Sequence, residues 1–240
     1  MNETMELIHK RRSTRVPFDP DHPVAEEDLR QILEAGRWSP TPHNMQNFEI
    51  LVVRDKKTIE RLGKIESRVT ETFLRENYEQ LSFSKEELMK KKTGILAAGF
   101  PAEMRDPSEF QKVAREGTSM PLRYAIDGSP ALLIVFYDTR KRAPDSEGDV
   151  LGLVSLGCLM ENMWLMATSL GISVRVLSDF GDRDVEGKAK TALDIPDHMK
   201  VVYALRLGYP RTEPRQDLRV RREIDDFTYS DRYGNKGAGT

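Results

Sequence analysis

The chain has 240 residues, of which 38% are hydrophobic and 32% are charged, and its formal net charge is −2. This length allows one large domain or a small pair of domains. The near-zero charge provides no global field that would attract nucleic acid or an anionic membrane surface, so we expect neither partner. The single cysteine, Cys158, excludes an intrachain disulfide and a cysteine-based metal cluster. Because the sequence shows no signal peptide and no apolar run of spanning length, we expect a cytoplasmic protein.

The N-terminal stretch combines a short helix with a dense basic segment. Residues 4–12 have the apolar spacing of a short helix, and their basic end suits the helix dipole. Three arginines and a serine then fall within five residues, Arg11, Arg12, Ser13 and Arg15. On a helical turn Arg11 and Arg15 would share one face. Guanidinium forks match phosphate oxygens, so the segment predicts either a phosphate pocket or, as the plainer alternative, a solvated basic turn.

An amphipathic helix predicted over 24–36 leads into a polar loop. The loop, residues 38–48, carries two prolines together with the hydroxyl of Thr41 and the amides of Asn44 and Gln46. Rigid polar loops fed by a helix often position ligands. The alternative is an ordinary helix-to-strand connector whose amides satisfy backbone groups. An apolar strand is predicted directly after it, over 49–53.

Residues 56–120 are rich in charged side chains, with apolar residues at helical spacing. Ser84 followed by Glu87 has the pattern of a capping box and predicts the start of a helix. We expect a mostly helical segment with a mobile excursion within about 70–120. Such excursions commonly cover a binding site.

The second half alternates between strands and helices. The apolar run 131–137 predicts a strand buried on both faces. A helix over 150–170 is apolar nearly all round, which predicts an interior position that could include a subunit interface. The remaining predictions are a strand over 172–178, a helix over 182–193, a strand over 199–207 and an extended tail from about 210.

Two motifs in this order make the chain resemble the nitroreductase family of FMN-dependent oxidoreductases. Arg11–Arg15 is similar to the family's R-R-S-x-R element, and residues 39–48 are similar to its S-P-S-x-x-N-x-Q-P-W loop. Further stretches resemble the family's central helix, its closing strand and turn, and its C-terminal basic element: 161–171, 207–210 and 219–222. The region 56–125 is unmatched.

The resemblance implies an α+β fold. The family has a three-layer sandwich, in which helices flank a mixed, mainly antiparallel sheet around a long central helix. It also implies one FMN-binding domain over residues 1–240 and an intertwined homodimer with FMN at the interface. Strand–helix alternation alone would have suggested a doubly wound sheet, so this architecture rests on the resemblance.

The resemblance further implies which residues hold FMN. Arg11 or Arg12, with Ser13, would grip phosphate or ribityl oxygens, and Arg15 would reach the N1/O2 edge of the flavin, where a cation stabilises reduced FMN. The loop would contact the isoalloxazine and ribityl groups, in part from the other subunit, and the end of the 172–178 strand would line the ring through backbone groups. The residues beyond the first segment are Pro40, Thr41, Asn44, Gln46, Leu177, Ser178, Arg219 and Arg221.

The implied reaction is a ping-pong transfer. NADH or NADPH would give hydride to FMN, and a small electron-poor acceptor such as a nitroaromatic or quinone would then be reduced. The cofactor carries this chemistry, so no catalytic side chain and no metal is expected. Asn47 and Phe48 replace the family's usual Pro-Trp, and Pro42 replaces a small residue, which leaves the acceptor open.

Other interpretations of the sequence stay open. One is a flavin enzyme of the same superfamily with another reaction, such as reductive dehalogenation or flavin fragmentation. Another is a protein that binds or stores FMN without catalysis. The last is a basic turn with no phosphate ligand.

Overall fold

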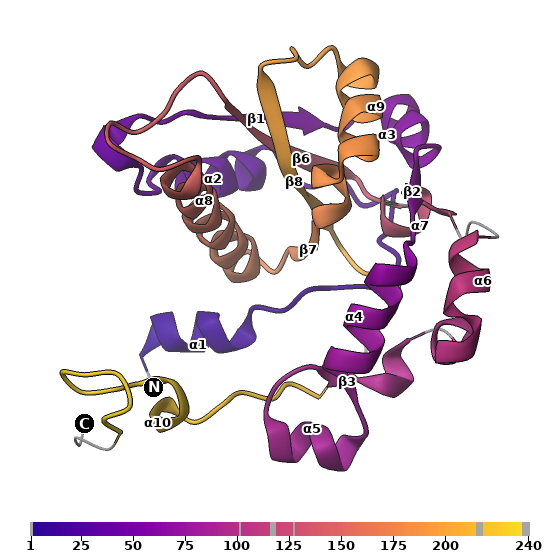
Figure 1. The fold of residues 1–240 in the computed structure, drawn as a ribbon. Coiled ribbons are helices and arrows are strands. Elements are labelled where there is room, and N and C mark those ends of the chain that lie inside the picture. The colour runs from indigo at the N-terminus through magenta and orange to yellow at the C-terminus, as the bar shows by residue number, and fades with distance from the viewer. Residues whose placement is uncertain (1, 101, 116–118, 127, 215–217, 237–240) are drawn as a thin grey trace. The chain divides into compact units, whose positions relative to one another are not determined.

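The computed structural model describes residues 2–100, 102–115, 119–126, 128–214 and 218–236. Its contacts divide the chain into two units (Figure 1). The first unit comprises Met1–Ser67 and Met120–Pro214, and the second comprises Arg68–Ser119 and Arg215–Thr240. The expectation of one FMN-binding domain with an excursion and a tail stays a prediction.

A four-stranded antiparallel sheet forms the centre of the first unit. Its strand order is β1 (Phe48–Val53), β6 (Ala131–Asp138), β8 (Met199–Gly208) and β7 (Ser173–Leu177). All three pairings in this sheet are antiparallel. All 8 residues of β6 are buried, as its unbroken apolar run predicts. The topology excludes the doubly wound sheet and agrees with the fold implied by the resemblance.

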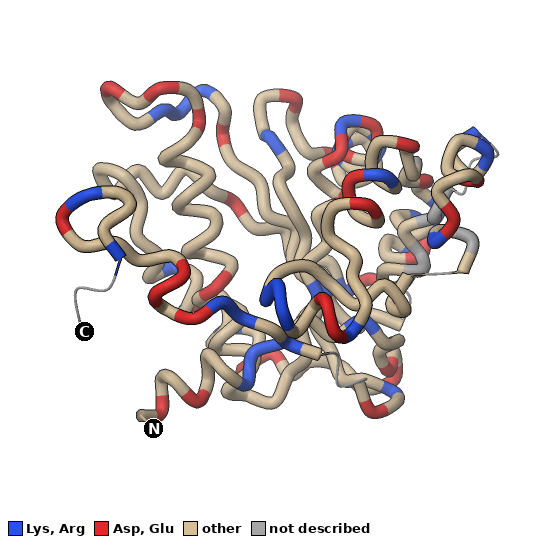
Figure 2. The backbone as a smooth tube through the Cα atoms, turned by 60° about the horizontal axis from the view of Figure 1, so that its bottom comes forward, with Lys and Arg blue, Asp and Glu red and all other residues tan. Residues whose placement is uncertain are grey.

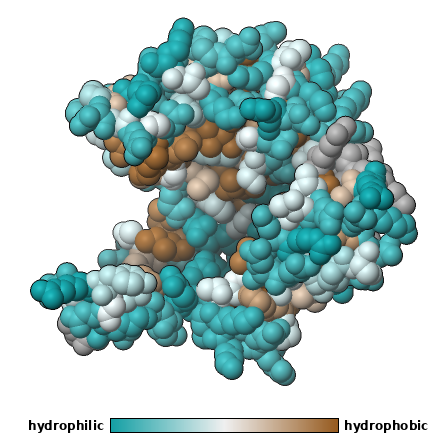
Figure 3. All heavy atoms as spheres, in the orientation of Figure 1, coloured by the Kyte–Doolittle hydropathy of each residue, from teal (hydrophilic) through white to brown (hydrophobic). Residues whose placement is uncertain are grey.

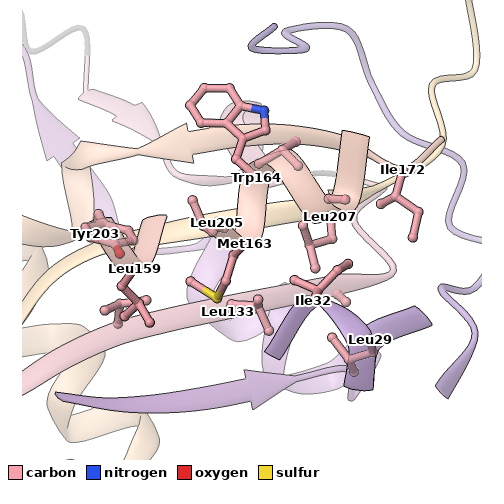
Figure 4. Close-up of a cluster of buried hydrophobic side chains, with 14 of the residues drawn as sticks. Leu29, Ile32, Leu133, Leu159, Met163, Trp164, Ile172, Tyr203, Leu205 and Leu207 are labelled. Atoms are coloured by element: carbon pink, nitrogen blue, oxygen red, sulfur yellow. The ribbon is translucent and has the colours of Figure 1, made fainter. Parts of the chain in front are cut away.

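Helices cover both faces of this sheet. On one face lie α2 (Glu26–Arg37) and α8 (Val150–Ser169), whose apolar side chains meet Leu133, Tyr203 and Leu205 of the strands (Figure 4). The other face is covered by α3 (Lys56–Gly63), α7 (Arg123–Ile126) and α9 (Arg183–Leu193), which pack on Leu132, Ile134 and Ala204. The result is a three-layer α+β sandwich, so the predicted fold class is confirmed.

Helix α8 is buried along only part of its length. Leu156, Leu159 and Met163 are buried in the core, whereas Val150 is 61% exposed and Val154 is 58% exposed. The later turns are therefore interior, as predicted, whereas the first turns leave hydrophobic atoms on the surface of the described chain (Figure 3). A subunit interface over these first turns stays a prediction.

The composition of α8 also corrects one expectation. The sequence analysis expected no apolar run of membrane-spanning length. Helix α8 is nevertheless long and apolar enough to cross a membrane. Its buried residues pack against α2 and the sheet, which is how the core helix of a globular domain behaves.

The second unit has a small core of its own. It contains α4 (Glu71–Leu81), α5 (Lys85–Lys91), α6 (Phe110–Arg115) and, in the tail, α10 (Ile224–Phe227). Leu74, Met104 and Phe110 are buried together. Ser84 and Glu87 form the predicted capping box at the start of α5.

The helices predicted within 56–120 are present, as α3, α4, α5 and α6, but they do not fill the segment. Short strands interrupt it: β2 (Glu66–Arg68) pairs with β5 (Ser119–Pro121), and β3 (Ser82–Phe83) pairs in parallel with β4 (Ile95–Leu96). Three 3-10 turns, Ala97–Gly99, Ala102–Met104 and Pro107–Glu109, complete it. Apolar spacing did not reveal strands of two or three residues, because a period cannot be read over so few positions.

Charged residues of both signs are interspersed along the backbone of the described chain (Figure 2). This distribution matches the formal net charge of −2. The overall charge therefore does not point to a binding site, whereas the local group of arginines in the basic segment, Arg11–Arg15, does.

Candidate functional site

The basic segment after the first helix is extended. Helix α1 (Glu3–Lys10) is capped by Asn2 and ends at Lys10, because Arg11 takes an extended ψ of 126°. Ser13 forms a parallel bridge to Val174 of β7, and the Thr14 amide donates to the Val174 carbonyl at 2.8 Å. The prediction of a helix to residue 12, with Arg11 and Arg15 on one helical face, is therefore wrong. Pairing with the edge strand β7 keeps this part of the chain extended.

Arg11 is the residue of this segment that contacts α8. Its Nε lies 3.0 Å from Glu161 Oε1, and its guanidinium carbon lies 4.6 Å from the centre of the Trp164 ring. The Nε–H does not make an aligned hydrogen bond to Glu161. Within the described residues, Arg11 Nε and Trp164 Nε1 are both buried donors without a hydrogen-bond acceptor. Buried donors of this kind are costly unless a ligand or water supplies an acceptor.

The other residues of the segment differ in exposure. Arg12 and Arg15 are exposed, Ser13 is half-buried and Thr14 is buried. The charge of Arg15 repels that of Arg175 on β7 and contributes to lowering the pKa of Arg175. The segment therefore keeps two guanidinium groups on the surface while its backbone is held against β7.

Arg175 adds a further positive charge beside this segment. Its side chain is partly buried, and burial is the main cause that lowers the pKa of its guanidinium below the usual value. Asp179 raises this pKa, and Arg15 lowers it further. Arginine remains charged despite such shifts, so this edge of the sheet has a positive potential that Asp179 offsets in part.

The polar loop holds itself in an uncommon backbone conformation. It contains the 3-10 turn η1 (Pro42–Asn44). His43, Asn44 and Gln46 have positive φ angles of 50°, 53° and 44°. The Gln46 amide donates to Thr41 Oγ1 at 3.2 Å, and Gln46 Nε2 donates to Asn44 Oδ1 at 2.9 Å. Non-glycine residues at positive φ often mark functional sites, where surrounding contacts hold the strain.

Two successive residues of α8 bring the two motifs together. Glu161 forms the ion pair with Arg11, and Asn162 Nδ2 donates to Ser39 Oγ at 3.0 Å. Ser39 is buried and opens the loop, while the neighbouring Pro40 is exposed. Segments that lie far apart in the sequence therefore meet at one stretch of α8.

The end of β7 completes the arrangement in the first unit. Leu177 is the last residue of β7 and is buried, whereas Ser178 is exposed and begins the 3-10 turn η5 (Ser178–Gly181). Because Ser13 pairs with Val174, the basic segment runs beside this strand. This bridge lies three residues before Leu177, and the lining role of the backbone at Leu177 and Ser178 stays a prediction.

Two predicted residues belong to the second unit. Arg219 and Arg221 lie in the tail, where Arg221 Nη1 donates to the Val220 carbonyl at 2.7 Å. Their contribution to a site on the first unit stays a prediction. Among the residues that the structure describes, no three His, Cys, Asp or Glu side chains gather into a potential metal site.

Several residues of this site escaped the sequence analysis. Glu161 and Trp164 looked like ordinary members of an apolar helix, and nothing in their spacing pointed to Arg11. Arg175 and Arg206 carried a usable signal, since each places a charge inside a strand that is otherwise mostly apolar.

Comparison with known proteins places this geometry in a family. The profile described as "Nitroreductase family" matches residues 8–209. Protein DrgA of Synechocystis sp. is 26% identical over 172 residues, covering 70% of this chain and 68% of that protein. A Haemophilus influenzae protein, provisionally named as an NAD(P)H nitroreductase, is 37% identical over 60 residues, which is 25% of this chain and 27% of that protein.

Solved structures agree in fold. The nitroreductase with bound FMN from Bacteroides fragilis aligns with a TM-score of 0.53 and 24% identity, covering 88% of this chain and 89% of that chain. The FMN-dependent nitroreductase of Clostridium difficile aligns with a TM-score of 0.58 and 16% identity, covering 96% and 98%. Since the family profile spans most of the sequence, including both segments that meet at α8, the chain belongs to the nitroreductase family.

Proposed function

We propose that this protein is an FMN-dependent oxidoreductase, which takes hydride from NADH or NADPH and reduces a small electron-poor acceptor of the nitroaromatic or quinone type. Family membership supports an oxidoreductase. The FMN bound to the Bacteroides fragilis nitroreductase and the FMN dependence of the Clostridium difficile nitroreductase support the cofactor. The name of the Haemophilus influenzae relative supports the nicotinamide donor.

The observation that carries the proposal is the pair of buried donors beside the basic segment. Trp164 Nε1 has no hydrogen-bond acceptor among the described residues, and Arg11 Nε is ion-paired with Glu161 but makes no aligned hydrogen bond to it. Arg12 and Arg15 are exposed nearby in sequence. The phosphate and ribityl chain of FMN offer many oxygen acceptors and a double negative charge. The residues present therefore fit a ligand of this class.

Each segment has a proposed role toward FMN. Arg11 or Arg12, with Ser13, binds the phosphate or ribityl oxygens, and Arg15 faces the N1/O2 edge, where its charge favours reduced FMN. Bound FMN would supply the hydride and electron transfer. The chain's own residues would bind and orient it and would set its redox potential.

The loop and the strand end would hold the ring. Thr41 and Asn44 would contact the isoalloxazine and ribityl groups, with Pro40 and Gln46 shaping the same loop. Backbone groups of Leu177 and Ser178 would line the ring, and Arg219 and Arg221 would add charge at the phosphate end. The positive φ angles of the loop support its role as a preformed contact surface.

We further propose a cytoplasmic homodimer with FMN at the interface. The first turns of α8 expose Val150, Leu151, Leu153 and Val154, and α1 exposes Met5 and Ile8. A run of exposed apolar side chains such as that on the first turns of α8 often marks an interface. Sedimentation of the purified protein should give a dimer, and a monomer that still binds FMN would refute the interface location.

Steady-state kinetics tests the proposed reaction. Initial rates measured with NADPH or NADH against a nitroaromatic or a quinone should give the parallel double-reciprocal lines of a ping-pong mechanism. A protein that binds FMN tightly but shows no turnover with either donor would instead be a storage or binding protein. Loss of intact flavin under oxygen would indicate a flavin-fragmenting enzyme.

A further inference from the structure

A charged side chain lies at the centre of the sheet in the first unit. Arg206 of β8 is only 1% exposed, and among the described residues it has the largest of the fully buried side chains. Its neighbours across the sheet are Leu132 of β6 and Arg175 of β7. Burying a guanidinium is costly unless strong polar contacts compensate for lost water. The position therefore calls for an explanation beyond apolar packing.

The contacts of Arg206 are directed at the backbone of two segments. Its Nη1 donates to the Ala125 carbonyl of α7 at 2.7 Å. Its Nη2 donates to the Val16 carbonyl at 2.6 Å and to the Thr14 carbonyl at 3.3 Å. The guanidinium carbon also lies 3.8 Å from the centre of the buried Phe18 ring, a cation–π contact. One side chain thus binds the chain that leads out of the basic segment.

These contacts bracket Arg15. The Thr14 and Val16 carbonyls lie on either side of Arg15 in the chain, and both accept from the same nitrogen of Arg206. The Thr14 amide in turn donates a hydrogen bond to the Val174 carbonyl of β7. The backbone around Arg15 is therefore fixed on both sides, while the Arg15 side chain itself is exposed.

We propose that Arg206 is a positioning residue for the flavin site, which holds the backbone of residues 14–16 so that the Arg15 guanidinium is presented to the cofactor. This inference rests on the proposed FMN function. Because Arg206 is buried and its guanidinium is bonded to backbone carbonyls, we expect its influence on flavin reduction to pass through Arg15. Replacing Arg206 should then change the ratio of affinities for reduced and oxidised FMN only in a protein that still has Arg15.

A double-mutant cycle tests this dependence. The variants are Arg15→Met, Arg206→Met and the pair together, each reconstituted with FMN. Two quantities are measured, the Kd of oxidised FMN by fluorescence titration and the midpoint potential by spectroelectrochemistry. The midpoint potential of bound FMN, compared with that of free FMN, gives the ratio of affinities for reduced and oxidised FMN, and the Kd shows whether the variant still binds the oxidised cofactor.

We expect Arg15→Met to lower this ratio about tenfold, which corresponds to about 30 mV for a two-electron couple. Arg206→Met should reproduce most of that loss, and the double variant should lose no more than Arg15→Met alone. Losses that add independently, or an unchanged ratio in Arg206→Met, would overturn the proposal. If wild-type protein binds no FMN, the proposed function itself fails, which is a distinct result.

A matched control separates positioning from general stability. Tyr203 lies on the same strand, faces the other core and donates its hydroxyl to the Leu156 carbonyl at 2.9 Å. Tyr203→Phe should lower thermal stability and leave the affinity ratio unchanged. An equal shift of the ratio in Tyr203→Phe would assign the effect to stability and overturn the proposal.

A second variant keeps the test valid if Arg206→Met does not fold. Arg206→Lys retains the charge but cannot direct a planar fork at carbonyls of both segments. Its affinity ratio should fall between those of the wild type and Arg15→Met. A wild-type ratio in folded Arg206→Lys would show that the fork does not act on Arg15.

Discussion

The two segments that meet at α8 are stabilised in opposite ways. The basic segment is held from outside, by Val174 of β7, by Arg206 of β8 and by the ion pair of Arg11 with Glu161. The polar loop is held in part by itself, through the hydrogen bonds that Gln46 makes within it, and at its end by the Asp138 amide, which donates to the Asn47 carbonyl at 3.0 Å. Its contact with α8 through Ser39 is a single side-chain hydrogen bond.

This difference indicates which residues fix the conformation of each segment before a ligand binds. The surrounding fold determines where the charges of the basic segment point, so substitutions far away in sequence should disturb them. The loop's conformation depends on its own residues, so substitutions inside it should matter most. Each prediction below tests one side of this contrast.

The largest effect is expected from the charges themselves. Arg12→Ala combined with Arg221→Ala should weaken FMN binding by roughly 3–6 kcal/mol, or about two to four orders of magnitude in Kd, because each charge-assisted hydrogen bond contributes roughly 1.5–3 kcal/mol. Fluorescence titration measures the change. Arg54→Ala is the control, since Arg54 is an exposed arginine paired with Glu26. Unchanged FMN affinity in the double variant would remove both arginines from the site.

The next effect concerns the self-supported loop. Asn44 has a φ of 53°, a conformation that costs an L-residue about 1–2 kcal/mol relative to glycine. Asn44→Ala should therefore be less stable than Asn44→Gly by about 1 kcal/mol in urea unfolding. Both variants lose the side chain, so both should lose the same FMN affinity. Equal stability of the two variants would show that the loop relaxes and is not held in this conformation.

A smaller effect is expected where the loop meets α8. Ser39→Ala and Asn162→Ala each remove one hydrogen bond and should lower the free energy of unfolding by about 1 kcal/mol. The double variant should cost little more than either single variant, because both remove the same contact. FMN affinity should change less in Ser39→Ala than in Asn44→Ala. The reverse order would mean that α8, and not the loop itself, sets the loop's conformation.

The smallest effect is expected at Glu161. Its carboxylate offsets the charge of Arg11 and is partly exposed, so Glu161→Gln should tighten FMN binding only a few-fold, roughly 0.2–1 kcal/mol. The gain should shrink as salt is raised from 50 to 500 mM, since added ions screen exposed charges. Weaker binding in Glu161→Gln would show that the carboxylate positions Arg11 and does not compete with the phosphate.

Much of the fold followed from hydrophobic periodicity. The helix predicted over 150–170 is observed over Val150–Ser169, and the strand predicted over 131–137 is observed over Ala131–Asp138. Long, strongly apolar elements are specified locally, because their pattern persists over several turns or pairs. The apolar composition of α8 did not reveal that its first turns are exposed, because composition does not show which residues pack against another part of the chain.

The sequence singled out candidate residues for the site, but it did not reveal their geometry. The arginines of the basic segment were found, but their helical arrangement was wrong, because bonding of Thr14 to Val174 outweighs the local helical tendency. The role of Arg206 depends on contacts with residues more than 180 positions away in sequence. The positive φ of Gln46 was equally hidden, since glutamine, unlike asparagine and histidine, is not enriched in that conformation.

The most direct test of the account is the visible absorption spectrum of the purified protein supplied with FMN, recorded before and after anaerobic addition of NADPH and then NADH. The account predicts protein-bound flavin absorption that bleaches with at least one of the two donors. Protein that remains colourless after reconstitution with FMN, or bound flavin that neither donor reduces, would contradict it.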